Sequence, residues 1–493
     1  MIQGFSVRGF RAFSNSGDVP LAPITCLVGR NSSGKSTLLN ALLLLRQSIE
    51  QRPVGSRVPQ LNLNGTLLNL GSYNDIVHGH NTNLPISFSF QTNSQTEVIR
   101  RRPYPNPAIV NLDVPRSPEY PHRFLSYRNY EMIKNKQDDH IKKVNIELFF
   151  LPEPPFGPAL SRLDIEVVGI GKASFRRTTG ERMEQHWRVY PKNIPRQSVE
   201  IYFPSWSFFP NILVRDEKVI SLDKEQKKLV DDFVAYSQLA ILDIHLFLSE
   251  LKLLGPFRTP PSRRYSFTGI GAIDTGLSGE RAVDLLITEK LVRPGNQYLN
   301  KAVSYWLRRL GLAHNVDVHD LAKKSNVFEL NISGAGIAKT ANFADVGFGI
   351  SQVLPVLVQG LLVPRGSTYI VQQPELHLHP DAQAGLADFF IYLATQNVRS
   401  IVETHSEYLL LRLRRRLAEH AKPYIIGLPG EKTDAKRFNH ESLSVVFVGE
   451  QDKKILVKKL EIGPAFQFDD LPNGFMNQAV NDRLALLKAL SKS

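Results

Sequence analysis

The sequence of 493 residues predicts an α/β fold in which a parallel sheet is interrupted by a β-rich insertion. An apolar run at residues 24–28 leads through a glycine-rich loop into a helical pattern. Two later apolar runs, Thr368–Val371 and Ser400–Val402, are also followed by helical patterns, as is typical of buried parallel strands. Between these regions, short runs alternate polar and apolar residues and therefore predict antiparallel strands.

The same patterns divide the chain into four segments. Residues 1–84 are expected to form the first part of the parallel unit, 85–222 the polar β-rich insertion, 223–450 the helical part and second half of the parallel unit, and 451–493 a small C-terminal domain. Expected elements are a strand at 2–7, insertion strands at 86–90, 144–148, 163–167 and 199–203, and a helical stripe from 223 to 254. Arg100–Lys136 lacks periodicity and predicts a long irregular loop.

Composition narrows the class of protein. A single cysteine, Cys26, excludes an internal disulfide framework, and no apolar run reaches transmembrane length. With no basic leader at Met1–Phe5, these features favour a cytoplasmic protein without a membrane partner. The net charge of +13 favours a polyanionic partner, DNA or RNA, or an acidic protein, although basic charge can also serve solubility alone.

The glycine-rich loop Gly29–Ser36 has the spacing of a P-loop between a strand and a helix. Its glycines allow the backbone to wrap around phosphate oxygens, and the helix N-terminus adds N–H groups. Lys35 is expected to reach the β- and γ-phosphates, and Ser36 to offer its hydroxyl to Mg²⁺. The sequence thus predicts ATP and Mg²⁺ as cofactors. The expected nucleotide contacts in this loop are Gly29, Asn31, Ser32, Ser33, Gly34, Lys35, Ser36 and Thr37.

Three later motifs fit the other half of a nucleotide site that the P-loop begins. The strand 368–371 ends in Gln372 and Gln373, followed by Pro374–Pro380 with Glu375 near its start. The strand 400–402 is followed by Glu-Thr-His-Ser, in which His405 is placed to contact a γ-phosphate. The glycine-rich stretch 345–352 leads into a helix beginning at Ser351, whose N–H groups could face phosphate.

In this order the motifs resemble the ABC-type ATPases related to the SMC, RecF and OLD proteins. The resemblance covers residues 1–80 and about 250–450, and the strings around Glu375 and His405 are similar to a compact prokaryotic branch found in anti-phage defence modules. Leu471–Met476 resembles that branch's short C-terminal domain of unknown function. The resemblance implies an ABC-type P-loop ATPase head with a β-rich insertion and, given the frequent prolines, no long coiled-coil arms.

The resemblance also implies site residues. Two sites would form between two subunits, with Ser351 of one chain facing ATP held by Lys35 of the other, and with Arg11 and Arg258 near the nucleotide. The metal ligands would be Ser36 and the residue at 372. The catalytic positions would be Gln372, Gln373, Glu375 and His405.

At two of these positions the sequence departs from the family. Gln372 stands where an acid would bind Mg²⁺, and Gln373 stands at the usual catalytic glutamate position. Glutamine cannot accept a proton at neutral pH, so hydrolysis is expected to be slow or absent. The pattern leaves open whether the chain is naturally a slow member or carries an acid replaced to trap ATP.

Three functions remain open at this stage. The resemblance favours an oligomeric sensor ATPase (a hydrolase) that couples nucleotide state to an effector, a nuclease or other toxic protein, in antiviral defence. The first alternative is a DNA-binding repair or recombination ATPase, for which Arg100–Arg102 and nearby tyrosines could bind nucleic acid unless they form a solvated loop. The second alternative is a non-hydrolysing scaffold that ATP locks into an assembly.

Overall fold

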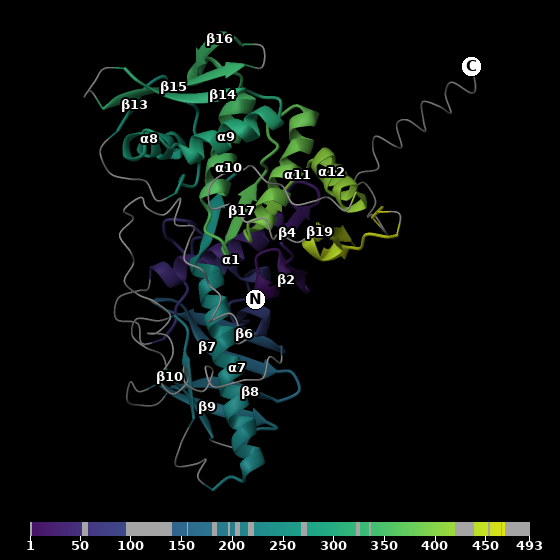
Figure 1. The fold of residues 1–493 in the computed structure, drawn as a ribbon. Helices are drawn as coiled ribbons and strands as arrows, with labels where there is room; N and C mark the ends of the chain where they lie inside the picture. Colours follow the sequence, from purple (N-terminus) through teal and green to yellow (C-terminus); the bar gives the residue numbers. More distant parts are fainter. Residues whose placement is uncertain are drawn as a thin grey trace.

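The computed structural model describes most of the chain. The described residues are 2–51, 58–94, 141–154, 156–179, 185–195, 198–202, 208–214, 221–267, 274–321, 326–334, 337–419, 438–451, 454–464 and 466–468. Figure 1 shows a central parallel sheet with its helices, an antiparallel sheet with a long helix along it at one end, and a small sheet at the other.

The parallel sheet is built from both halves of the chain. Its strands are, in order across the sheet, β12 (Leu251–Leu254), β17 (Thr368–Gln372), β18 (Arg399–Glu403), β4 (Ile24–Val28), β19 (Leu443–Gln451) and β20 (Lys454–Leu460). All neighbouring pairs are parallel except the last, which is antiparallel. The N-terminal strand β4 therefore lies between two strands from the C-terminal half.

Helices cover both faces of this sheet, which explains why its strands are apolar throughout. On one face, Leu27, Ile370 and Ile401 join the core formed with α1 (Lys35–Glu50) and α7 (Lys224–Ser249). The opposite face, including Cys26, Val371 and Val402, packs in a second core. The helices that contribute to this second core are α8 (Ala282–Val292), α9 (Tyr298–Arg309), α10 (Phe348–Leu362), α11 (Pro380–Thr395) and α12 (Glu407–Ala418).

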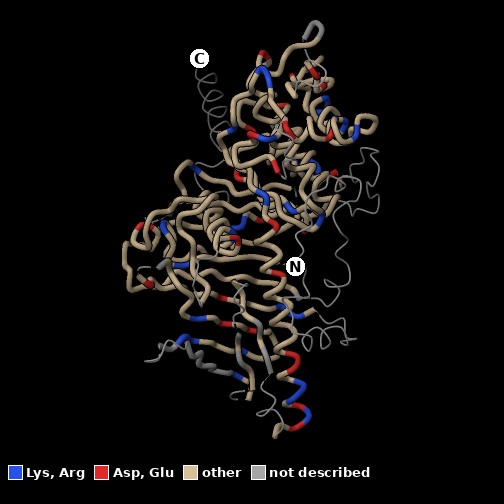
Figure 2. The backbone as a smooth tube through the Cα atoms, turned by 90° about the vertical axis from the view of Figure 1, so that its left-hand side faces the viewer, with Lys and Arg blue, Asp and Glu red and all other residues tan. Residues whose placement is uncertain are grey.

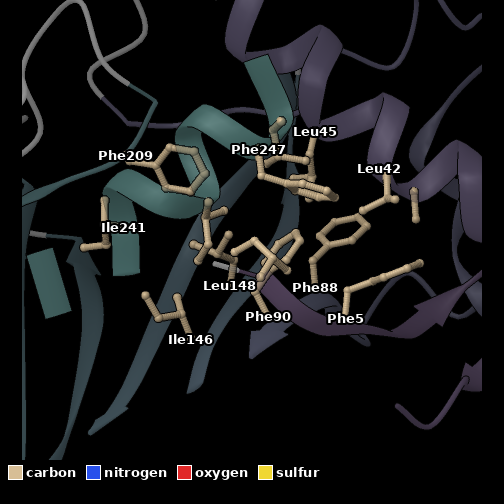
Figure 3. Packing of buried hydrophobic residues seen from close by; sticks show 14 of the residues in the cluster. Phe5, Leu42, Leu45, Phe88, Phe90, Ile146, Leu148, Phe209, Ile241 and Phe247 are labelled. Atoms are coloured by element: carbon tan, nitrogen blue, oxygen red, sulfur yellow. The ribbon is translucent and has the colours of Figure 1, made fainter. Parts of the chain in front are cut away.

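The antiparallel sheet follows the alternating pattern of its sequence. Its strands are, in order, β2 (Phe13–Asn15), β1 (Ile2–Phe10), β5 (Ile86–Ser94), β6 (Lys142–Glu153), β7 (Phe156–Val167), β8 (Gly171–Thr179) and β9 (Gln185–Lys192), with β3 (Val19–Pro20) beside β1. Alternate side chains such as Phe88, Phe90 and Leu148 pack against α1 and α7 (Figure 3). Because β1 pairs with β5, the sheet continues across residue 84, where the sequence analysis places a segment boundary.

The expected helical stripe from 223 to 254 is wrong at its C-terminal end. Helix α7 begins after the Asp223 N-cap, whose side chain accepts a hydrogen bond from the Gln226 N–H, and it ends at Ser249. Leu251–Leu254 instead forms β12, in parallel register with β17. Four apolar or long side chains before Gly255 fit an edge strand as well as a helical turn, and pairing with β17 decides between them.

The remaining elements surround these two sheets. They are β10 (Val199–Tyr202), β11 (Asn211–Val214), β13 (Tyr265–Ser266), β14 (Asn315–Asp320), β15 (Val327–Gly334), β16 (Ile337–Asn342), α2 (Tyr73–Ile76), η1 (His78–His80), η3 (Phe343–Asp345) and η4 (His440–Ser442). Strands β13 to β16 form the small sheet, next to which Trp306 of α9 is fully buried against Phe389 of α11.

The α/β class with a β-rich insertion is confirmed. The expected strands at 86–90, 144–148 and 163–167 lie in β5, β6 and β7, while Arg100–Lys136 and Leu471–Met476 lie outside the described residues. Within the described part of the chain, no helix has the length and apolar character to cross a membrane, and no coiled-coil arm extends from the core. Figure 2 shows basic and acidic residues interspersed over the described backbone in that view.

Candidate functional site

Three neighbouring strands bring the predicted motifs together. In the order β17, β18, β4 all strands run parallel, so their carboxyl ends lie at one edge of the sheet. Open α/β sheets bind ligands at this edge. The P-loop follows β4, Gln372 is the last residue of β17 with Gln373 directly after it, and His405 follows β18.

The P-loop has the backbone conformation that its glycines predict. Gly29 and Gly34 have φ of 140° and 103°, in the region that favours glycine. A Cβ atom on Gly29 would lie 1.9 Å from the Val448 carbonyl oxygen, so no larger residue fits there. Lys35 is buried, and its Nζ donates to the carbonyl oxygens of Gly29 at 3.1 Å and Arg30 at 2.6 Å.

Two features of the loop suit an anionic ligand. Helix α1 begins at Lys35 with no side-chain cap and no acidic residue in its first turn. The Thr37 N–H donates to the Gly34 carbonyl oxygen at 3.0 Å, and the N–H groups of Lys35 and Ser36 are the ones that suit an external acceptor. The Ser33 hydroxyl is buried without a hydrogen-bond partner in the described part of the chain. A phosphate group would supply acceptors for both, so the loop fits a nucleotide phosphate.

A carboxylate that the sequence analysis missed lies at the centre of the site. Glu403, the last residue of β18, accepts hydrogen bonds from Ser36 Oγ at 2.8 Å and from Gln372 Nε2 at 2.7 Å. It is 5% exposed. The signal in the sequence is its position two residues before His405, at the end of the strand. Its neighbours β4 and β17 come from distant parts of the chain, and only the fold reveals them.

The other predicted catalytic residues lie around Glu403. Gln373 has φ of 47°, and its N–H donates to the Glu403 carbonyl oxygen at 2.7 Å. Glu375 is buried, and its Oε1 accepts a hydrogen bond from the His405 N–H at 2.7 Å. The His405 side chain is exposed at the sheet edge. Glu375 therefore holds the loop that carries His405.

Burial and charge set the protonation of these groups. Burial lowers the pKa of Lys35, although the carboxylates of Glu403 and Glu375 oppose that change. Although His405 is partly open to solvent, desolvation by the protein around its ring, together with the positive charge of Lys35, lowers its pKa, and the negative charge of Glu403 opposes that change. Burial raises the pKa of Glu375 despite its hydrogen bonds.

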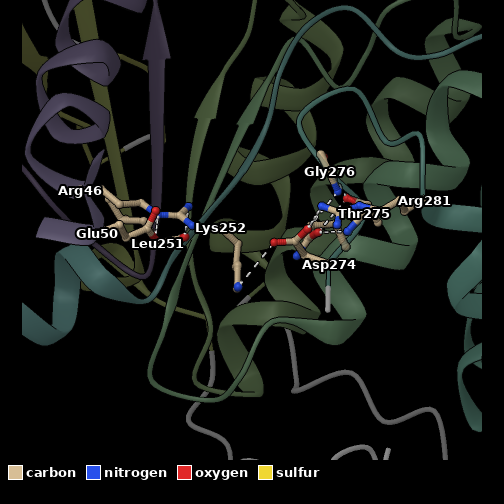
Figure 4. Close-up of polar contacts among 9 residues, drawn as sticks. Arg46, Glu50, Leu251, Lys252, Asp274, Thr275, Gly276 and Arg281 are labelled. Carbon is tan, nitrogen blue, oxygen red and sulfur yellow. Dashed lines mark hydrogen bonds and ion pairs between the residues drawn. The ribbon is translucent and has the colours of Figure 1, made fainter. Parts of the chain in front are cut away.

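Arg258 approaches the site from the segment after β12. One Nη atom donates to the Gln372 carbonyl oxygen at 3.0 Å, while its Nε and its other Nη are buried without a hydrogen-bond partner among the described residues. Asp274, in the segment before α8, forms ion pairs with Arg281 at 2.5 Å and with Lys252 of β12 at 3.7 Å (Figure 4). These ion pairs hold the segment before α8 against β12. Figure 4 also shows Arg46 of α1, which donates to the Leu251 carbonyl oxygen and ties that helix to β12.

The glycine-rich motif at 345–352 presents a different surface from the one expected. Helix α10 begins at Phe348, so Ser351 lies in its first turn, where its side chain is buried and its Oγ donates to the Phe348 carbonyl oxygen at 2.8 Å. The exposed residues of the motif are Asp345, Gly347 and Phe348. The Phe348 ring lies 6.0 Å from that of His377, in the segment that follows β17.

Arg11 lies in the turn between β1 and β2 with φ of 49°. Its N–H donates to the Ile76 carbonyl oxygen at 2.6 Å, and its own carbonyl oxygen contacts His78 Nδ1 at 2.8 Å. Phe13, two residues later, lies against Gly34, where an added Cβ would be 3.0 Å from the phenyl ring. The turn is therefore adjacent to the P-loop through Phe13.

Comparison with known proteins agrees with this geometry. Residues 24–135 and 307–412 match the family model described as "AAA domain, putative AbiEii toxin, Type IV TA system". These segments include the P-loop strand, α10, β17 and β18. Over these segments the chain is similar to an AAA-type P-loop ATPase domain. The comparison with curated proteins finds no match.

Solved structures of SMC heads are similar over most of their length but at low identity. The SMC head bound to the C-winged helix domain of ScpA has 13% identity and a TM-score of 0.42, over 94% of this chain and 98% of that chain. The Pyrococcus furiosus SMC head with an extended coiled coil, bound to the C-terminal domain of ScpA, has 12% identity and a TM-score of 0.39, over 99% of each chain. The Thermotoga maritima SMC head domain has 9% identity and a TM-score of 0.34, over 94% of this chain and 99% of that chain.

Proposed function

We propose that this ATPase domain binds ATP with Mg²⁺, hydrolyses it slowly, and uses the bound nucleotide to join two copies of the chain. The observation that carries the proposal is the convergence of Lys35, Ser36 and Gln372 on one sheet edge around Glu403. The P-loop N–H groups and Ser33 would hold the phosphates, with Lys35 turned from its own carbonyl acceptors toward them. Bound Mg²⁺ would neutralise phosphate charge, and Ser36 lies where it could ligate the ion.

Slow turnover follows from the residues beyond β17. Gln373 can orient a water molecule by hydrogen bonding but cannot take its proton. Glu375, the nearest acid in the motif, is buried and already accepts the His405 N–H. We assign to Glu375 the positioning of His405, and to His405 a contact with the γ-phosphate. Because hydrolysis would be slow, the ATP-bound state of the chain would persist.

Association of two copies is supported by the surface beside the site. Phe348 is 69% exposed at the uncapped N-terminus of α10, and Phe257, next to Arg258, is 85% exposed. A second molecule that brings γ-phosphate to this helix N-terminus would cover Phe348 and satisfy N–H groups of Gly347–Gly349. The backbone of the motif, rather than the Ser351 hydroxyl, would then contact the partner's ATP.

We further propose that the assembled state controls an effector protein in a defence module. The family description names a toxin–antitoxin system, which agrees with the resemblance of the motifs around Glu375 and His405. An ATP-locked scaffold is the second candidate, favoured by the two glutamines at 372 and 373. Direct action on DNA is the third, and its support is the net charge of +13.

Binding of a fluorescent ATP analogue tests the central claim. Lys35→Ala is expected to weaken binding at least about tenfold because it removes a charged phosphate donor. Lys459→Ala is the matched control, since Lys459 is a surface lysine paired with Glu461 at 2.9 Å. Equal affinities of the two variants and the parent would reject the nucleotide site. Phosphate release by the parent chain then separates the slow ATPase from the scaffold, which would release none.

A further inference from the structure

The buried acid Glu403 raises a question that the proposed function leaves open. Glu403 is buried, with only 5% of its surface exposed. In the described part of the chain it nevertheless forms no ion pair with a lysine, arginine or histidine. Its two oxygens are held by neutral donors, the Ser36 hydroxyl and the Gln372 amide. A buried carboxylate is costly unless a cation compensates it. The field of Lys35 supplies part of that compensation at a distance.

We infer that Glu403, at the end of β18, supplies the metal-binding carboxylate of the nucleotide site, in place of an acid at Gln372 on β17. Magnesium prefers one or two carboxylates, with the remaining positions filled by phosphate oxygens and water. Ser36 Oγ lies 2.8 Å from Glu403 Oε1, so the P-loop hydroxyl and this carboxylate can ligate one ion. No other acid contacts Ser36 among the described hydrogen bonds.

Gln372 then has a defined role beside the metal. Its amide donates to Glu403 Oε2 at 2.7 Å, which fixes the carboxylate so that Oε1 faces Ser36. Two acids at 372 and 403 would place like charges at hydrogen-bond distance, and one would be driven to protonate. An acid on one strand and an amide on the next keep one negative charge in the site. Gln372 therefore holds the Glu403 carboxylate in place without adding a second negative charge.

The inference rests on the proposed function, and the two fail in different ways. The full chain is titrated with a fluorescent ATP analogue in EDTA and in saturating Mg²⁺, and the Mg²⁺-dependent gain in affinity is recorded. Bound Mn²⁺, measured by electron paramagnetic resonance, gives a second readout that does not depend on turnover. If the parent chain binds no nucleotide in either buffer, both the proposed function and this inference are overturned.

Glu403→Gln is expected to keep the affinity seen in EDTA and to lose the Mg²⁺-dependent gain, with Mn²⁺ affinity reduced about 10- to 100-fold. The double variant Gln372→Glu with Glu403→Gln exchanges acid and amide and should restore much of the gain. Glu289→Gln is the matched control, because Glu289 is a buried acid in α8 that accepts the Leu299 and Asn300 N–H groups far along the chain from the P-loop.

An unchanged Mg²⁺ gain in Glu403→Gln, with the control also unchanged, would overturn the inference. Circular dichroism reports folding of each variant. If Glu403→Gln does not fold, the exchanged double variant decides, since it preserves the acid–amide contact. Restored Mg²⁺ dependence in that variant supports the inference, and a folded double variant that binds nucleotide but no Mn²⁺ overturns it.

Discussion

The Glu375 carboxylate accepts the backbone N–H of His405 at 2.7 Å, which joins the loop after β17 to the loop after β18. The contact lies inside the protein, since Glu375 is 7% exposed, and its Oε2 has no hydrogen-bond partner in the described part of the chain. The charged groups that act on it are Arg258, whose guanidinium favours the carboxylate, and Lys35. Burial nevertheless raises the pKa of Glu375 above its usual value.

We expect Glu375→Gln to increase the melting temperature at neutral pH. The amide oxygen can still accept the His405 N–H, and the cost of a buried charge is removed. Because the folded-state pKa is raised, the parent chain loses stability as the pH rises above the ordinary value of 4.5, where the unfolded chain ionises first. The gain of the variant should therefore be small near pH 4.5 and grow toward neutral pH. A variant that becomes less stable than the parent as the pH rises would contradict this account.

Ser33→Ala is expected to weaken ATP binding by about three- to tenfold with little change in stability. Its buried hydroxyl has no partner in the described chain, so its removal costs no internal hydrogen bond. Ser48→Ala is the converse control. The Ser48 hydroxyl donates to the Leu44 carbonyl oxygen at 2.6 Å and accepts the Asn62 N–H at 2.9 Å. That variant should lose about 1–2 kcal/mol in denaturant unfolding and keep its nucleotide affinity.

Phe348→Glu should block ATP-dependent association and leave nucleotide binding by the single chain intact. The side chain is 69% exposed, so the substitution does not disturb the core, and its negative charge repels the γ-phosphate that the second molecule would bring. Leu291→Glu, at an exposed apolar residue of α8, is the control and should associate like the parent. Light scattering with and without Mg²⁺ and ATP measures the assembly. If both variants associate equally well, the N-terminus of α10 is not part of the contact.

Asp388→Asn is expected to destabilise the fold by about 3 kcal/mol, as measured by denaturant unfolding. Asp388 of α11 is buried and pairs with Arg412 at 3.0 Å and Arg416 at 2.8 Å on α12, and with Arg309 at 3.7 Å on α9. Loss of its charge leaves the arginines with less compensation and weakens the packing of these helices. Glu419→Gln changes an exposed acid that also pairs with Arg416, and little change in stability is expected there.

The sequence alone determined the features that are local along the chain. The P-loop is eight consecutive residues whose glycines, lysine and serine fix the turn, the helix start and the phosphate chemistry together. Period-two alternation likewise predicted β5, β6 and β7, because a strand with one buried face imposes that period on its own residues. The resemblance of the motifs indicated the P-loop ATPase fold, since strand ends and motif order can be compared without knowing contacts.

The tertiary structure decided which residues meet. Glu403 joins Ser36 and Gln372 only because β18 lies between β4 and β17, and residues separated by more than 360 positions carry no sequence signal of that order. The same holds for Leu251–Leu254, whose pairing with β17 overrides a helical pattern, and for Ser351, whose hydroxyl turns to the Phe348 carbonyl oxygen. A hydrogen bond or a strand pair depends on distances across the fold, and these are set by the packing of the whole chain.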